Sequence, residues 1–181
     1  MARIPSIDPD DVAPEHRDLL ARPIALHRAL VNSPGALRAF GGLGQYIRHG
    51  STLDPRLREL AILQVGYLAR SPYEWSHHIK IGHDFGVTDA DIAGLIAETE
   101  GRESRLDPLA RAVLRAAREI AEGEIGEASW TALAAALSTE HLVDLVMTIG
   151  FYCAVVRILA SLRIEVEPDY MPYLQRFPLP G

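Results

Sequence analysis

Residues 54–78, DPRLRELAILQVGYLARSPYEWSHH, decide the fold, because they predict two long helices joined by a short connection. Asp54-Pro55 indicates a helix start, since aspartate caps helix N-termini and proline is favoured in the first turn. The helix that it opens is apolar on nearly every side after Leu60, so we expect it to be buried. The next helix begins near Pro72, and the short connection makes the two helices antiparallel.

Four ionisable residues of this stretch indicate chemistry. Glu59 lies on the apolar helix, where a carboxylate must find a partner or stay protonated. Glu74, His77 and His78 lie one turn apart on the second helix, so they can project from similar faces. Antiparallel packing then brings carboxylates and imidazoles together. Adjacent helical residues point about 100° apart, so we expect only one of the two histidines to be central.

These residues follow a regular spacing. Ser71 lies twelve residues after Glu59, Glu74 lies three residues after Ser71, and His78 lies four residues after Glu74. Gly86 lies eight residues after His78. The pattern resembles the carboxymuconolactone decarboxylase / AhpD-like family, in which the glutamate is followed by Cys-Pro-x-Cys-x-x-x-His and then by the glycine. The detailed resemblance covers roughly residues 53–95. It implies an all-α, AhpD-like helical bundle and a homo-oligomer, commonly a trimer or hexamer, with the site near subunit contacts.

The chain departs from the family at the two cysteine positions, which hold Ser71 and Glu74. In the AhpD-like branch these cysteines cycle between dithiol and disulfide, and the glutamate and histidine relay protons to them. Cys153 is the only cysteine and lies far along the chain, so thiol-dependent peroxidase chemistry is excluded as an intrinsic activity of this site. The decarboxylase branch works without a cysteine pair or a cofactor, and its proton transfer needs an acid/base such as histidine.

We therefore expect a cofactor-independent acid/base enzyme, a decarboxylase or related lyase or isomerase, that acts on a small carboxylate or lactone-type molecule. His78 is the expected acid/base, and Glu59 is expected to orient it and to set its tautomer. Tyr73, Glu74 and Ser71 are expected to contact the substrate. The pair of Glu59 and His78 also fits a second interpretation, in which His78 is a core histidine bonded to Glu59 for structural reasons alone.

Arg157 is a further candidate for substrate binding, because its sequence neighbours are apolar and a buried cation needs an anion. A substrate carboxylate could be that anion; alternatively, Arg157 pairs with Asp144, with Glu59 or with a partner subunit. Two other functions stay open for the chain as a whole. One is a diverged member that acts as a binding or assembly module, and the other is a peroxidase-related protein that uses an external thiol.

The composition of the 181 residues, 48% hydrophobic and 23% charged, is that of a globular protein. The net charge of -6 and the lack of a Lys/Arg-rich block argue against nucleic acid as a partner. The longest apolar run, residues 142–162, is interrupted by Asp144 and Arg157. The uncharged stretch between these two residues is too short to span a bilayer. We expect a cytoplasmic protein without a membrane, metal or cofactor partner.

The whole chain predicts one helical domain, residues 15–167, between two proline-rich ends. Residues 1–14 are expected to be an extended N-terminal arm. Residues 168–181 are expected to be an extended C-terminal tail whose aromatic side chains pack on the core or on a neighbour. Further helix starts are predicted near Pro14, Pro34, Thr88, Pro108, Glu127 and Thr139.

Overall fold

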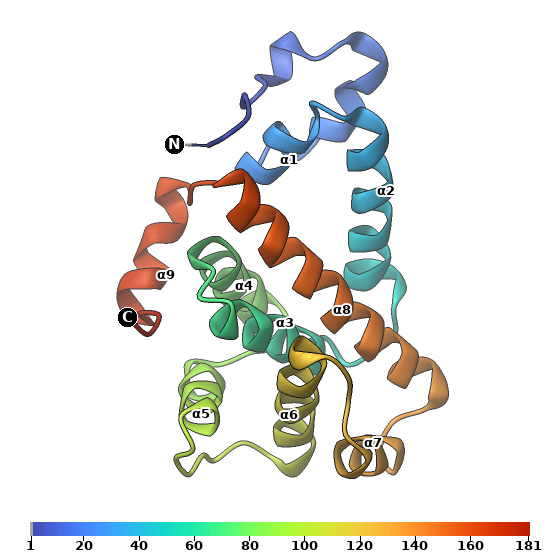
Figure 1. Cartoon of the computed structure of the whole chain (residues 1–181), viewed down its shortest axis with the longest axis vertical. Coiled ribbons are helices and arrows are strands. Elements are labelled where there is room, and N and C mark those ends of the chain that lie inside the picture. Colours follow the sequence, from blue (N-terminus) through green and yellow to red (C-terminus); the bar gives the residue numbers. More distant parts are fainter. Residues whose placement is uncertain (1) are drawn as a thin grey trace.

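The computed structural model describes residues 2–181, which form helices and no β-strand, as the sequence predicts. The α-helices are α1 (Ala25–Leu30), α2 (Pro34–Gln45), α3 (Pro55–Leu68), α4 (Pro72–Asp84), α5 (Asp89–Thr99), α6 (Pro108–Glu122), α7 (Glu127–Ala134), α8 (Thr139–Leu162) and α9 (Met171–Arg176) (Figure 1). Shorter elements are the 3-10 helices η1 (Pro9–Asp11), η2 (Pro14–Leu20) and η4 (Pro168–Tyr170), and the π-helical turn η3 (Tyr46–Gly50). Each predicted helix start is confirmed to within a residue.

Side-chain caps explain why the long helices begin where they do. At each capped start, a side-chain oxygen accepts a backbone N–H from the first turn, which would otherwise have no partner in the helix. These caps are Asp54, Ser71, Thr88, Asp107 and Ser138. Proline occupies the first turn of α3, α4 and α6, where its missing N–H costs nothing. Local sequence therefore determines these boundaries.

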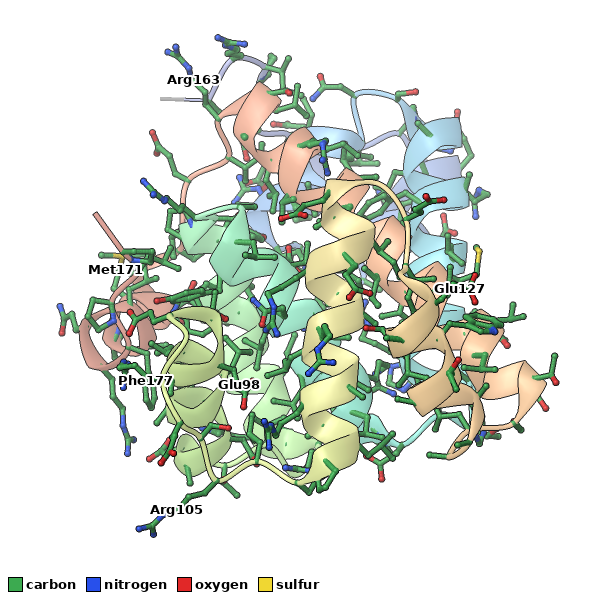
Figure 2. The ribbon with its side chains drawn as sticks, turned by 60° about the horizontal axis from the view of Figure 1, so that its bottom comes forward. Glu98, Arg105, Glu127, Arg163, Met171 and Phe177 are labelled. Atoms are coloured by element: carbon green, nitrogen blue, oxygen red, sulfur yellow. The ribbon has the colours of Figure 1, made fainter. Side chains whose placement is uncertain are left out.

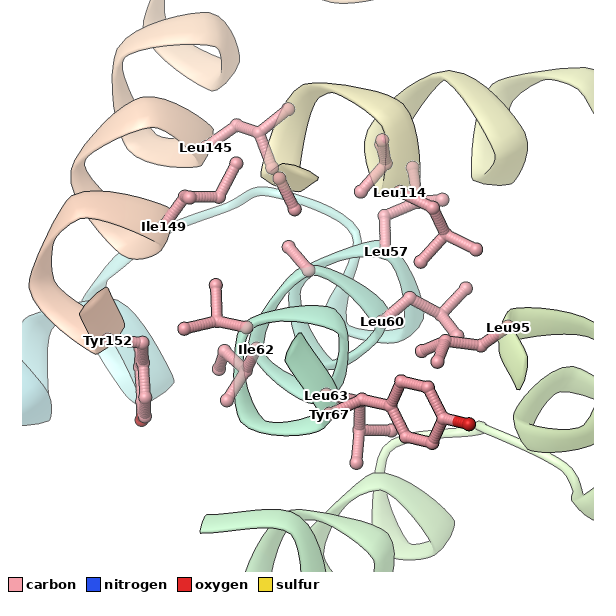
Figure 3. Close-up of a cluster of buried hydrophobic side chains, with 14 of the residues drawn as sticks. Leu57, Leu60, Ile62, Leu63, Tyr67, Leu95, Leu114, Leu145, Ile149 and Tyr152 are labelled. Atoms are coloured by element: carbon pink, nitrogen blue, oxygen red, sulfur yellow. The ribbon is translucent and has the colours of Figure 1, made fainter. Parts of the chain in front are cut away.

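Helix α3 is the centre of the bundle and packs against α4, α6 and α8. Its side chains radiate toward all three neighbours (Figure 3), and Leu60, Ile62 and Leu63 are completely buried. The prediction of a buried helix is thus confirmed, and its apolar surface on every side is explained by neighbours on every side. Burial of this kind stabilises a fold by about 1.5–3 kcal/mol for each large aliphatic side chain.

Helix α8 is the longest helix and is apolar enough, by length and composition, to cross a membrane. Its inner face, which includes Leu145, Ile149 and Tyr152, is instead buried in the same core as α3 (Figure 3). We therefore describe α8 as a core helix of a soluble protein.

The two ends are more helical than predicted. The N-terminal arm contains η1, and the C-terminal tail contains η4 and α9 instead of being extended. Pro168 and Pro172 stand in the first turns of these two elements, where proline is compatible with a helix. Tyr173 and Phe177 pack against the core, and the carbonyl of Phe177 accepts a 2.7 Å hydrogen bond from Nε1 of Trp75. Figure 2 shows Phe177 and Met171 together on this side of the bundle, whereas Arg105 and Arg163 project outward.

Candidate active site

Glu59, His78 and Glu74 form a continuous hydrogen-bonded chain between α3 and α4, here called the Glu59–His78–Glu74 triad. Nδ1 of His78 lies 2.7 Å from Oε2 of Glu59, and Nε2 lies 2.9 Å from Oε1 of Glu74. All three side chains are buried. A carboxylate oxygen only accepts hydrogen bonds, so the ring donates to both partners only when it carries two protons.

A tight turn and a close helix contact place the triad. Arg70 adopts the left-handed conformation, with φ of 48°, and reverses the chain between α3 and α4. Gly66 lets the two helices approach closely, because a Cβ atom at this position would lie 3.3 Å from the backbone nitrogen of Trp75. Glu59, two turns before Gly66, therefore lies beside His78, as the antiparallel arrangement predicts.

Arg58 supplies a second cation to the buried cluster. Its Nε atom lies 3.1 Å from Oε1 of Glu59, and its guanidinium lies over the ring of Phe85, 4.5 Å from the centroid. With His78 protonated, two cations face the two carboxylates of Glu59 and Glu74. The cluster is then electrically neutral, which is the condition under which buried charges are tolerated.

The electrostatics of the triad favour this charged state. Burial by itself lowers the pKa of His78, but the carboxylates of Glu59 and Glu74 outweigh burial and raise the pKa to about 9. Burial likewise raises the pKa of Glu59, but His78 and Arg58 outweigh it and hold that pKa below its usual value. At neutral pH the triad is therefore an imidazolium between two carboxylates.

We expect the free energy of unfolding to depend on pH through His78. Its pKa is about 9 in the folded protein against an ordinary 6.5. Its stabilising contribution is therefore complete below about pH 6.5 and is lost as the pH rises through about 9. Chemical denaturation from about pH 6 to about pH 9 measures this loss. The control variant His78→Gln cannot titrate there, and the same pH dependence in both proteins would contradict the assignment.

The triad borders a cavity of about 440 Å³ that is lined by residues of η2, α1, α2, η3, α4 and α8. The predicted site residues Tyr73, Glu74 and His78 lie in its wall, whereas Glu59 is not in the wall and reaches the cavity only through His78. Tyr152 of α8 also lines the cavity and meets His78 edge-on, with ring centroids 5.0 Å apart. Burial raises the pKa of the Tyr152 phenol far above its usual range, so it stays protonated. The volume suits a small organic molecule.

Arg22 and Arg48 line the cavity, and within residues 2–181 neither has a carboxylate partner. Arg48 lies in the π-helical turn η3, a kind of turn that is frequent at functional sites. Arg38 also lines the cavity but pairs with Asp18 at 2.8 Å. This wall therefore offers uncompensated positive charge to a bound molecule.

Sequence reasoning missed Arg48 and Tyr152 as site residues. The signal for Tyr152 was a line of polar residues at four-residue intervals, Asp144, Thr148 and Tyr152, on an otherwise apolar helix. Arg48 follows α2 without any capping pattern, and we see no sequence signal that places it in the site. It reaches the cavity because the π-helical turn carries it there.

His77 lines the cavity together with His78, so the expectation that only one histidine is central is wrong. Its ring stacks between those of Tyr73 and Tyr170, with centroids 3.9 Å and 3.5 Å away. Nδ1 lies 2.8 Å from the carbonyl oxygen of Tyr73, and Nε2 lies 3.1 Å from Oε2 of Glu167. Glu167 also accepts a 2.7 Å hydrogen bond from the backbone of Ala25. Two adjacent residues of α4, His77 and His78, therefore both line the cavity. The segment after α8 holds the ring of His77 in place through Glu167 and Tyr170.

The structure places Arg157, predicted to bind substrate, away from the cavity. This side chain is exposed on α8, does not line the cavity, and donates a 2.6 Å hydrogen bond to the carbonyl of Cys153 in its own helix. Neither alternative partner within the chain is used, because Glu59 bonds His78 and Asp144 accepts hydrogen bonds from Tyr46 and Ser51. The apolar neighbours of Arg157 in sequence misled the prediction, since α8 is apolar on its exposed face as well.

Ser71, predicted to contact the substrate, caps α4 and does not line the cavity. We expect Ser71→Ala to lower the free energy of unfolding by about 0.5–2 kcal/mol, the usual value of such a cap. Turnover by the folded variant should be unchanged, because its hydroxyl faces the backbone of Glu74. Thermal unfolding and a turnover assay on the same sample test both statements. A loss of turnover without a loss of stability would restore Ser71 to the site.

Fold and site together define a class: an all-helical bundle protein with a buried carboxylate–imidazole–carboxylate triad at a small cavity and no thiol pair. Residues 34–119, which include the spaced residues from Glu59 to Gly86, match the model of the Carboxymuconolactone decarboxylase family. The resemblance stated from the residue spacing is therefore confirmed. No curated protein matches the chain.

Solved structures confirm the AhpD-like fold. An uncharacterized peroxidase-related protein with an alkylhydroperoxidase AhpD core, from Ralstonia eutropha JMP134, is 18% identical with a TM-score of 0.79, over 96% of this chain and 95% of that one. A variant of the debrominase Bmp8 in complex with 2,3,4-tribromopyrrole is 17% identical with a TM-score of 0.81, over 97% of each chain. A peroxidase-related protein from Silicibacter sp. TM1040 is 18% identical with a TM-score of 0.69, over 93% and 92%. At these identities the likeness concerns the fold alone.

Proposed function

We propose that the protein is a cofactor-independent acid/base enzyme, a decarboxylase or related lyase or isomerase, that acts on a small carboxylate or lactone-type molecule. The observation that carries this proposal is the position of Glu74, whose carboxylate bonds His78 and also lines the cavity. A molecule in the cavity can therefore exchange a proton with Glu74 while His78 replaces it. This extends the expected roles, because Glu74 becomes a proton-transfer group as well as a pocket residue.

The triad supplies the proton that decarboxylation needs. The bond between carbon and the carboxylate breaks, CO2 leaves, and the electron pair that stays on the substrate carbon takes up a proton. Nε2 of the His78 imidazolium first passes its proton to the Glu74 carboxylate, and Glu74 then delivers that proton to the substrate carbon. Solvent later restores the proton on His78. Glu59 keeps its hydrogen bond to Nδ1 throughout and holds the ring in place. A tautomerisation uses the same groups, with proton removal and proton return at two substrate atoms.

The walls of the cavity support an acidic substrate with an apolar part. Arg22 and Arg48 provide the unpaired positive charge, in place of the Arg157 expected from the sequence. Leu26, Phe40 and Phe151 line the same space. A carboxylate bound by an arginine in a partly buried site gains from charge-assisted hydrogen bonds.

Incubation with lactone acids and keto acids in deuterated water tests the proposal. We expect CO2 release or deuterium incorporation at a substrate carbon, observed by NMR, and loss of both in the variant Glu74→Gln. The matched control is Asp84→Asn, which removes an exposed carboxylate from the same helix. An acid that binds equally to wild type and Glu74→Gln without turnover would instead assign the chain as a binding module.

The family resemblance also supports the proposals of a cytoplasmic location and of a homo-oligomer, either a trimer or a hexamer. A small molecule and further copies of the chain are thus the proposed partners. Size-exclusion chromatography with light scattering measures the number of copies directly, and a monomer at all concentrations would contradict the oligomer.

A further inference from the structure

One face of α8 is apolar and exposed. Val143, Val146 and Met147 are 56%, 37% and 46% exposed, although most large apolar side chains of residues 2–181 are covered. In Figure 1 α8 runs diagonally across the front of the bundle, and no other ribbon crosses in front of it. Contiguous exposed apolar surface on a soluble protein marks an interaction site.

The charge and size of the side chains on this face change regularly along the helix. At 3.6 residues per turn, six exposed positions share it, and we call them the α8 face: Glu140, Val143, Met147, Gly150, Ala154 and Arg157. An acidic residue stands at the start, large apolar residues follow, then small residues, and a basic residue stands at the end.

This order is self-complementary. Consider two copies of α8 packed antiparallel about a two-fold axis midway between Met147 and Gly150. Met147 of each copy then lies opposite the partner's Gly150, and Glu140 lies opposite the partner's Arg157. The same axis places Val143 opposite a small residue, Ala154. Each facing pair joins a large residue with a small one, or an acid with a base.

We propose that the α8 face binds the α8 face of a second copy of this chain in this antiparallel register. Arg157 has no carboxylate within 4.0 Å among residues 2–181, and its guanidinium reaches only a carbonyl of its own helix. The partner's Glu140 supplies the missing anion. A two-fold pair contains two such ion pairs, one at each end of the contact.

Helix geometry allows the contact to extend over this length. Glu140 and Arg157 are about 25 Å apart along the axis at 1.5 Å per residue. Antiparallel helices that cross at about 20° stay in contact over such a distance, with axes 8–10 Å apart. Gly150 permits the close approach, since the space around its missing Cβ is empty in the single chain. A two-fold contact requires an even number of copies, which favours a hexamer over a trimer and does not depend on the catalytic proposal.

Filling Gly150 tests the proposal without weakening the single chain. The variant Gly150→Leu has room for its side chain and gains helix propensity, so the fold is retained. The new leucine side chain occupies the space of the partner's Met147. We therefore expect the mass measured by light scattering to fall to that of a smaller assembly that lacks the α8–α8 contact. The matched control is Gly35→Leu, which also enters open space but lies on α2; it should keep the wild-type mass.

A charge exchange tests the register. Glu140→Arg and Arg157→Glu each place like charges opposite one another, and each should raise the Kd for association by about tenfold or more. The chain with both substitutions restores opposite charges and should regain wild-type association.

Three results would overturn the proposal. They are a wild-type chain with an odd number of copies, an unchanged mass for Gly150→Leu, and a double variant as weak as the single ones. Association of the wild-type chain with phosphatidylcholine vesicles in place of self-association would assign the face to lipid and overturn it as well.

Discussion

Replacement of His78 by glutamine is expected to lower kcat by about 10²–10⁴-fold, the usual loss for a positioned acid/base. Glutamine still reaches the neighbouring carboxylates but has no acidic proton near neutral pH, so Glu74 loses its proton supply. The fall should appear in kcat more than in KM, because the arginines that are proposed to bind the substrate are unchanged. Steady-state kinetics on a substrate found by the deuterium assay separate the two constants.

The control for this variant is His83→Gln on the same helix. His83 pairs with Asp89 at 3.1 Å and does not line the cavity, so its replacement should leave kcat unchanged. Circular dichroism shows whether each variant is folded. A folded His78→Gln protein with wild-type kcat would mean that the triad serves structure alone.

The variant Glu59→Gln is expected to lose about 3–5 kcal/mol of unfolding free energy at neutral pH, the usual cost of removing one partner of a buried ion pair. Glu59 is fully buried, and its loss leaves Arg58 and protonated His78 with one carboxylate between them. Urea denaturation measures the difference. The loss should shrink above about pH 9, because His78 then gives up its charge.

An exposed ion pair provides the comparison for Glu59→Gln. Arg102 pairs with Glu100, and both side chains are exposed. Arg102→Gln should change the free energy of unfolding by about 0–1 kcal/mol, because solvent screens such pairs. Equal, small effects of the two variants would show that Glu59 does not carry a buried charge.

Much of the fold could be predicted from the sequence because its signals are local. Asp54-Pro55 and Asp107-Pro108 mark helix starts by capping and by proline geometry, which need no tertiary contact. The burial of α3 followed from its composition. Helical spacing and the short connection also placed Glu59 beside His78.

Three features depended on the folded chain. Arg157 and Tyr152 lie on the same apolar helix, and only the packing of α8 against α3 decides that Tyr152 faces the cavity and Arg157 faces outward. Arg48 enters the site through a π-helical turn. The C-terminal tail is helical because α9 packs on α4, a contact between residues about a hundred positions apart.

The sequence by itself therefore determined the helices from α2 to α8, the burial of α3 and the pairing of Glu59 with His78, because capping, periodicity and short connections act within a few residues. Only the tertiary structure decided the protonation of His78, because that depends on two carboxylates meeting one buried ring. It also decided which cations face the cavity, because the π-helical turn brings Arg48 into the wall and the packing of α8 turns Arg157 outward.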